Sequence, residues 1–166
     1  MAQQNSFDVS TGADLQEVDN AVHQAMKEVN TRYDFKNTKC TIDFDRAKSV
    51  LTLEADDDYR LKALYDVLQT KFVKRGVPLK NMKPGSIQEA THGRARQVVT
   101  LTQGIPIETA KEIVKAIKQH GFKKVQSAIQ GDEVRISSPS KDELQQVMAF
   151  LRSQDYGIEL KFGNYR

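Results

Sequence analysis

One order of structural elements occurs twice along this chain of 166 residues, and the repetition restricts the fold more than any other feature. In each half, a strand-like alternation of apolar residues is followed by helical spacing, two further strands, a second helix and a last strand. Short segments align across the halves: Thr11-Gly12 with Gln103-Gly104, Asp58-Tyr59-Arg60-Leu61 with Lys141-Asp142-Glu143-Leu144, and Gly76-Val77-Pro78-Leu79 with Gly157-Ile158-Glu159-Leu160. Internal duplication of a βαββαβ unit explains the pattern most simply.

The duplication predicts an α+β protein with two domains, each an antiparallel sheet with two helices on one face. We place the first domain at residues 1–91 and the second at residues 92–166. The segment 80–96 is ambiguous, because it could finish the first domain, link the two, or extend the strand expected at 97–102.

Start and turn signals support this division into elements. Asp14 with Glu17, and Ser140 with Glu143, have the spacing of capping boxes at the starts of two helices. The Gly131-Asp132 pair between two apolar runs is the strongest hairpin signal in the chain.

Composition indicates a soluble globular protein, with 39% hydrophobic and 28% charged residues. No apolar run reaches the length of a membrane span, and the first five residues have no secretory signal, so we expect a cytoplasmic location. Cys40 has the strand parity of Ile42 and Phe44, which favours a buried small hydrophobe over a reactive thiol.

No catalytic pattern is evident in the sequence. The three histidines are scattered, and neither a zinc spacing nor a glycine-rich phosphate loop occurs. The acidic cluster of Asp43, Asp45 and Asp56–Asp58 could suggest a divalent metal, but the triplet lies where a helix N-terminus favours acceptors, so capping is preferred. We therefore expect no enzyme activity, no metal and no cofactor.

Positive charge is concentrated in residues 71–96, which contain seven basic residues and one acidic residue. This stretch suits the anchoring of phosphates. Arg94 and Arg96 alternate along an expected strand and would present two guanidinium groups on one face. For Lys71, Lys74 and Arg75 a simpler interpretation is a solvated helix end, where lysine is favourable to the helix dipole.

A second candidate segment, residues 31–36 (TRYDFK), follows the first expected helix. Its guanidinium group and aromatic rings suit stacking on a base and pairing with a phosphate. The alternative is structural, with Phe35 in the core and Arg32 paired with Asp34.

Four segments resemble the YajQ family of bacterial proteins: SFDVST at 6–11, TRYDFKN at 31–37, KRGVPLKN at 74–81 and RQVVTLTQGI at 96–105. The resemblance covers essentially the whole chain. It implies tandem ferredoxin-like domains similar to ribonucleoprotein domains, a cytosolic location and nucleotide binding without an established enzymatic activity. It also implies candidate ligands, namely purine nucleotides such as GTP or ATP, cyclic dinucleotides, and tRNA or other RNA.

The sheet faces differ from those of RNA-recognition motifs, which stack bases on aromatic side chains. The expected outward positions carry no aromatic residue; they are Thr41, Asp43, Thr52 and Glu54 in the first unit and Thr100, Thr102 and Arg135 in the second. We therefore predict a nucleotide-binding site formed by Arg32, Tyr33, Lys74, Lys80, Lys83, Arg94 and Arg96. The alternatives are a protein-interaction adaptor, whose ligand is another protein, and an enzyme.

Overall fold

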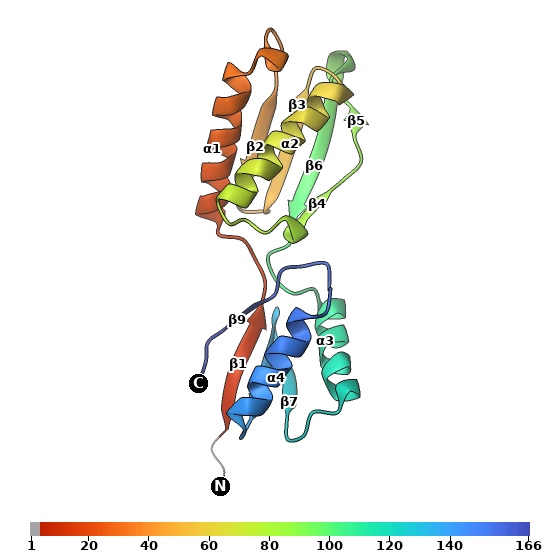
Figure 1. Cartoon of the computed structure of the whole chain (residues 1–166). Coiled ribbons are helices and arrows are strands. Elements are labelled where there is room, and N and C mark those ends of the chain that lie inside the picture. The colour runs from red at the N-terminus through yellow and green to blue at the C-terminus, as the bar shows by residue number, and fades with distance from the viewer. Residues whose placement is uncertain (1–3) are drawn as a thin grey trace. The chain divides into compact units, whose positions relative to one another are not determined.

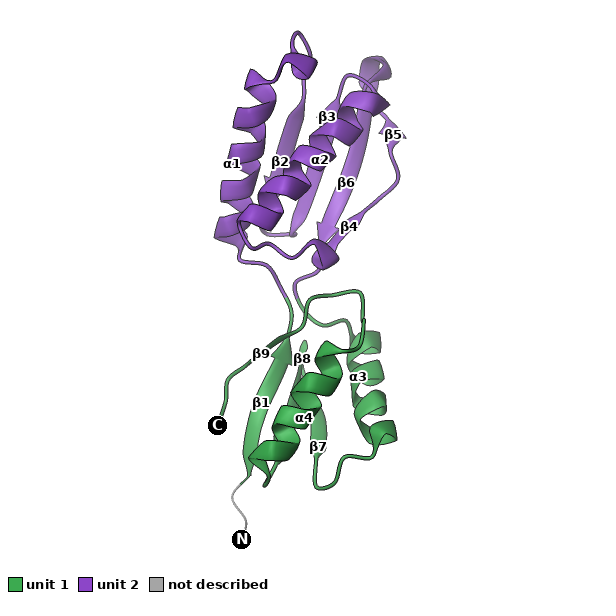
Figure 2. Ribbon diagram, in the orientation of Figure 1, with its two compact units in different colours: residues 1–11, 104–166 green, residues 12–103 purple. Residues whose placement is uncertain are grey.

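The structure is a computed structural model that describes residues 4–166 and divides into two compact units. Gly12–Gln103 form one unit, here called the central unit. The residues up to Thr11 join Gly104–Arg166 in the other, here called the split unit (Figure 2). The central unit is therefore inserted into the chain of the split unit.

The central unit contains two long helices over one antiparallel sheet (Figure 1). Its main elements are α1 (Leu15–Thr31), β2 (Thr41–Asp45), β3 (Val50–Ala55), α2 (Asp58–Lys74), β4 (Met82–Pro84), β5 (Gln88–Glu89) and β6 (Ala95–Leu101). Short 3-10 turns occur at η1 (Tyr33–Phe35), η2 (Leu79–Asn81) and η3 (Thr91–Gly93). The strand order is β2-β3-β6-β4, with β5 also paired to β6.

The split unit has the same plan, with two helices on one face of an antiparallel sheet (Figure 1). Its elements are β1 (Asn5–Ser10), α3 (Ile107–His120), β7 (Gln126–Gln130), β8 (Glu133–Ser138), α4 (Lys141–Arg152) and β9 (Lys161–Gly163). The strand order is β7-β8-β1-β9. The predicted class, α+β with two ferredoxin-like antiparallel domains, is confirmed.

The first strands of the two repeats are exchanged, and this corrects the division at residues 91 and 92. β1 opens the first repeat in the sequence but pairs with β8, with Asp8 opposite Arg135. β6 opens the second repeat but pairs with β3, with Leu53 opposite Gln97. The ambiguous segment 80–96 lies wholly in the central unit, where it supplies β4, β5 and the start of β6.

Helix starts follow the capping signals of the sequence. Asp14 accepts a hydrogen bond from the backbone N–H of Gln16 at 2.9 Å, and Ser140 accepts one from Glu143 at 3.1 Å. Asp57 accepts one from the N–H of Arg60 at 2.8 Å, so this member of the acidic triplet caps α2.

Each unit has its own apolar core between its helices and its sheet. Leu51, Leu64 and Val99 are fully buried in the central unit, whereas Phe7 and Ile113 are fully buried in the split unit. Cys40 is buried in the core of the central unit, as predicted, and this burial raises the pKa of its thiol. Across residues 4–166, none of the helices has the length and apolar character that crossing a bilayer requires.

Candidate functional site

A basic hollow lies between α1 and α2 of the central unit and has a volume of about 440 Å³. We call it the lysine hollow; it is lined by Gln24, Lys27, Glu28, Thr31, Lys71 and Lys74. The four residues from α1 recur at intervals of three and four, which places them on one helix face. Three lysines and one glutamate give this surface a net positive charge.

Glu28 organises the charges of the lysine hollow. One of its carboxylate oxygens lies 2.9 Å from Lys71 Nζ, and the other lies 3.5 Å from a guanidinium nitrogen of Arg32. The hydrogen bond from Lys71 lowers the pKa of Glu28 below its usual value. Lys27 and Lys74 form no ion pair with any residue in 4–166, so their ammonium groups are available to an anion.

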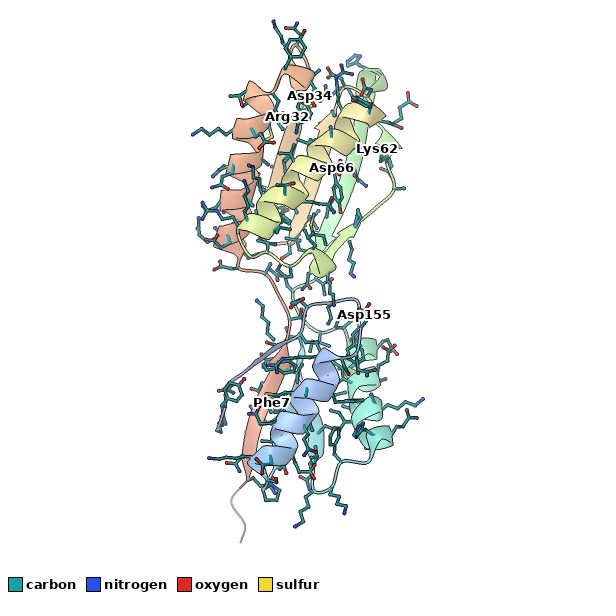
Figure 3. All side chains as sticks on the ribbon, in the orientation of Figure 1. Phe7, Arg32, Asp34, Lys62, Asp66 and Asp155 are labelled. Atoms are coloured by element: carbon teal, nitrogen blue, oxygen red, sulfur yellow. The ribbon has the colours of Figure 1, made fainter. Side chains whose placement is uncertain are left out.

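The predicted aromatic segment begins directly after α1. Arg32 makes a bidentate pair with Asp34, at 2.9 and 2.7 Å, and its guanidinium carbon lies 5.3 Å from the centre of the buried Phe35 ring (Figure 3). The structural alternative for Arg32, Asp34 and Phe35 is thus present. Tyr33 differs, because 87% of its surface is exposed, and Lys36 Nζ lies 5.9 Å from its ring centre.

The two predicted arginines of the basic stretch are both paired with carboxylates. Arg94 lies 2.6 Å from Asp56 and also donates to the backbone oxygen of Lys39 at 2.7 Å. Arg96 lies 2.8 Å from Glu54 on the sheet face that the helices leave uncovered. A phosphate that bound there would have to compete with these carboxylates.

A second hollow, of about 400 Å³, lies on this open sheet face beside Arg96. Thr41, Asp43, Thr52, Glu54, Arg96 and Val98 line it, so its acidic groups outnumber its basic ones. None of these lining residues is aromatic, as the sequence predicted for the outward positions of this face. Thr100 belongs to this same sheet, opposite Lys83, rather than to the other unit as expected.

The seven predicted site residues therefore do not form one cluster. Lys74 lies on α2 and lines the lysine hollow, Arg32 directly follows α1 and contacts Glu28 of the hollow, and Tyr33 begins η1. Lys83 and Arg96 lie on the sheet strands β4 and β6, Arg94 directly precedes β6, and Lys80 lies on the η2 turn. All seven nevertheless belong to the central unit.

The site prediction omitted Lys27 and Glu28. Their spacing relative to Gln24 and Thr31 was a usable signal for one helix face. The missing information was the packing of that face beside the C-terminal turn of α2, which carries Lys71 and Lys74.

No group of three or more histidine, cysteine or acidic side chains within residues 4–166 could hold a metal ion.

Comparison with known proteins gives consistent matches over almost the full length. The sequence profile described as "Nucleotide-binding protein YajQ-like" matches residues 5–166. A nucleotide-binding protein of Koribacter versatilis (strain Ellin345) is 49% identical over 162 residues, which cover 98% of this chain and 97% of that protein. Nucleotide-binding proteins of Desulfitobacterium hafniense (strain DSM 10664 / DCB-2) and Picosynechococcus sp. (strain ATCC 27264 / PCC 7002 / PR-6) are each 48% identical over 166 residues, with complete coverage of both chains.

Proposed function

Because this chain belongs to the YajQ-like family of nucleotide-binding proteins, we propose that it binds a nucleotide, without turning it over, at the lysine hollow of the central unit. The observation that carries the proposal is that Lys27, Lys71 and Lys74 line one hollow with a single carboxylate, that of Glu28, and that the exposed Tyr33 lies just beyond the end of α1. We expect this binding to take place in the cytoplasm.

The phosphates would contact the two lysines that have no carboxylate partner. Lys27 and Lys74 face the hollow from α1 and α2, and Glu28 of α1 already holds Lys71 of α2 in an ion pair. Both lysines are exposed to solvent, so each ammonium–phosphate contact should contribute up to about 1 kcal/mol. Two ammonium groups suit a ligand with at least two phosphate groups, as in GTP, ATP, a cyclic dinucleotide or an RNA strand.

The base would stack on Tyr33. Arg32 is fixed by Asp34 and Glu28, so it provides a stable base for the turn that carries Tyr33. Stacking of a base on an aromatic ring contributes about 1–3 kcal/mol and accepts any base. This arrangement supports nucleotide binding in general and does not select among purines by hydrogen bonding.

The test is a binding titration of GTP, ATP, a cyclic dinucleotide and a short single-stranded RNA with the full chain. Replacing Lys27 and Lys74 together by alanine should weaken the tightest ligand about tenfold or more, since about 1.4 kcal/mol corresponds to a factor of ten. Tyr33→Ala should weaken it about five- to tenfold, whereas Tyr33→Phe, which keeps the ring, should retain most of the affinity.

Lys62→Ala is the matched control, because Lys62 is an exposed lysine near the start of the same helix, α2, outside the hollow (Figure 3). Its affinity should equal that of the wild type. If Lys80→Ala, Lys83→Ala or the Arg94→Ala/Arg96→Ala double variant weakens binding and the lysine-hollow variants do not, the proposed site is wrong. Release of hydrolysed product at a rate above the protein-free control would contradict binding without turnover.

A further inference from the structure

The edge strand β7 of the split unit has features of a peptide-binding surface. We propose that β7 and the hollow beside it at the end of α3 bind an extended acidic peptide of a partner protein by β-strand addition. In this mode a peptide pairs with a free sheet edge, and pockets beside the edge select its side chains. The surface is independent of the lysine hollow, which lies in the other unit.

β7 lacks the protection that the other sheet edges carry. Natural edge strands are usually kept from pairing by charged side chains, proline or very short length. At the other edges, β2 carries Asp43 and Asp45, β4 has three residues and includes Pro84, and β9 has three residues. β7 has five residues, none of them charged or proline.

The hairpin geometry identifies the backbone groups that face outward. Gln130 and Glu133 flank the two-residue turn Gly131-Asp132, and Gly131 has a φ of 62°. In such a turn the flanking pair is hydrogen-bonded, and bonding then alternates along the strands. Ser127 and Ile129 therefore direct their N–H and C=O groups away from β8, and no described residue pairs with these groups.

A hollow of about 480 Å³, with a lining that is partly apolar and partly polar, runs beside this edge and is within the size range of small ligand sites. Ile117, Lys118, Phe122, Val125, Gln126 and Ser127 line it. Ile129, on the same sheet face as the buried Val134, leaves 37% of its surface exposed. An aliphatic side chain of a bound peptide would fit this hollow and would cover apolar surface that now faces water.

The charge around the hollow determines the kind of peptide. Residues 113–131 contain four lysines and no acidic residue. These lysines, Lys115, Lys118, Lys123 and Lys124, form no ion pair with any residue in 4–166. Their charge is complementary to aspartate or glutamate on either side of the aliphatic residue, and this complementarity favours an acidic partner over a basic one.

A random library of peptides of about ten residues, displayed on phage, provides the probe. Selection on the full chain should enrich sequences in which an aliphatic residue is flanked by acidic residues. A selected peptide should shift the backbone amide resonances of residues 117–130 in a two-dimensional NMR spectrum and leave those of the central unit unchanged.

Three variants test the contacts, with affinity measured by fluorescence anisotropy. Ser127→Pro removes an outward N–H but no β7–β8 hydrogen bond, and should weaken binding at least about fivefold. The double variant Lys118→Glu/Lys123→Glu should weaken it at least about tenfold. Lys111→Glu, two turns before Lys118 on α3, is the matched charge control and should change affinity less than about twofold.

The proposal is overturned if no peptide is enriched, if the enriched peptides are not acidic, or if binding persists in both Ser127→Pro and the double variant. A single-stranded oligonucleotide of about ten nucleotides is titrated in parallel. If it shifts residues 117–130 while no selected peptide does, the surface contacts nucleic acid and the proposed partner is wrong.

Discussion

Replacing Phe7 by alanine should destabilise the split unit and leave the central unit folded. Phe7 is fully buried, and its ring makes an edge contact with Phe162 at 5.8 Å between ring centres (Figure 3). Although Phe7 precedes α1 in the sequence, its core neighbours are Ile113, Val147 and Ile136. The loss of stability should therefore affect elements that lie more than a hundred residues after Phe7 in the sequence.

The expected size follows from the buried ring. Removal of a fully buried phenylalanine costs about 3–5 kcal/mol, which includes the cavity that remains, and a lost aromatic pair adds about 0.5–1.5 kcal/mol. A loss of about 4 kcal/mol lowers the equilibrium constant for folding roughly a thousandfold. For a single small unit this is a large part of the whole stability.

Native-state amide hydrogen exchange, read by NMR, measures the effect unit by unit. In Phe7→Ala, protection should fall for amides of α3, β8 and α4 and remain for those of α1, β3 and α2. Leu101→Ala is the reciprocal control: Leu101 lies on β6, next to α3 in the chain, but its side chain belongs to the core of the central unit. Its cost of about 2–5 kcal/mol should appear in α1, β3 and α2 instead.

If Phe7→Ala lowered the protection of α1 and α2 and left α3 and α4 unchanged, the strand exchange would be refuted. The two repeats would then be folded in sequence order, with the boundary near residue 91.

Two further predictions concern the same architecture. Residues 12–103 expressed alone should give a cooperative thermal transition, because that stretch contains its whole sheet and because Gln103 joins its ends through hydrogen bonds with the backbone N–H and C=O of Ala13 at 2.7 and 3.3 Å. Residues 104–166 alone should give no such transition unless a synthetic peptide of residues 4–11 supplies β1. A folded 104–166 fragment without that peptide would contradict the prediction. The hydrogen bond from Arg135 lowers the pKa of Asp8 below its usual value of 3.8. The ionised Asp8 should therefore stabilise the folded state above that pH, and this contribution should be lost as the pH falls through the lower pKa of the folded state. The difference in unfolding free energy between wild type and Asp8→Asn, measured by urea unfolding, should be constant near neutral pH and shrink below about pH 4. A difference that grew on acidification would disprove the prediction.

Much of the secondary structure could be predicted from local signals. The four helices, their caps at Asp14, Asp57 and Ser140, and the Gly131-Asp132 hairpin depend on residues close together in the sequence, where spacing is a direct record of geometry. The sheet to which a strand belongs is not a local property. β1 and β6 both alternate apolar and polar residues, and either could fill the central position of either sheet, so the exchange of the two strands left no mark in the pattern.

The residues of the candidate site also differ in whether they could be predicted from local sequence features. Lys74 and Tyr33 could be proposed from the sequence, since a basic helix end and an aromatic residue just after a helix are local features. The ion pairs of Arg94 with Asp56 and of Arg96 with Glu54 join residues 38 and 42 positions apart, across neighbouring strands. The alternation of the two arginines was evident, but the carboxylates opposite them depend on strand register, which the sequence alone did not specify.

The exchanged first strand also determines the order in which the protein becomes complete during translation. β1 leaves the ribosome before its partner β8, which is synthesised more than 120 residues later, as the pairing of Phe7 with Ile136 shows. At about 5–20 residues per second, this is a delay of roughly 6–25 s. The central unit can close during that interval, while Phe7 and Val9 remain exposed on an unpaired strand. A nascent chain of this protein therefore exposes the apolar residues of β1 to water until β8 has emerged.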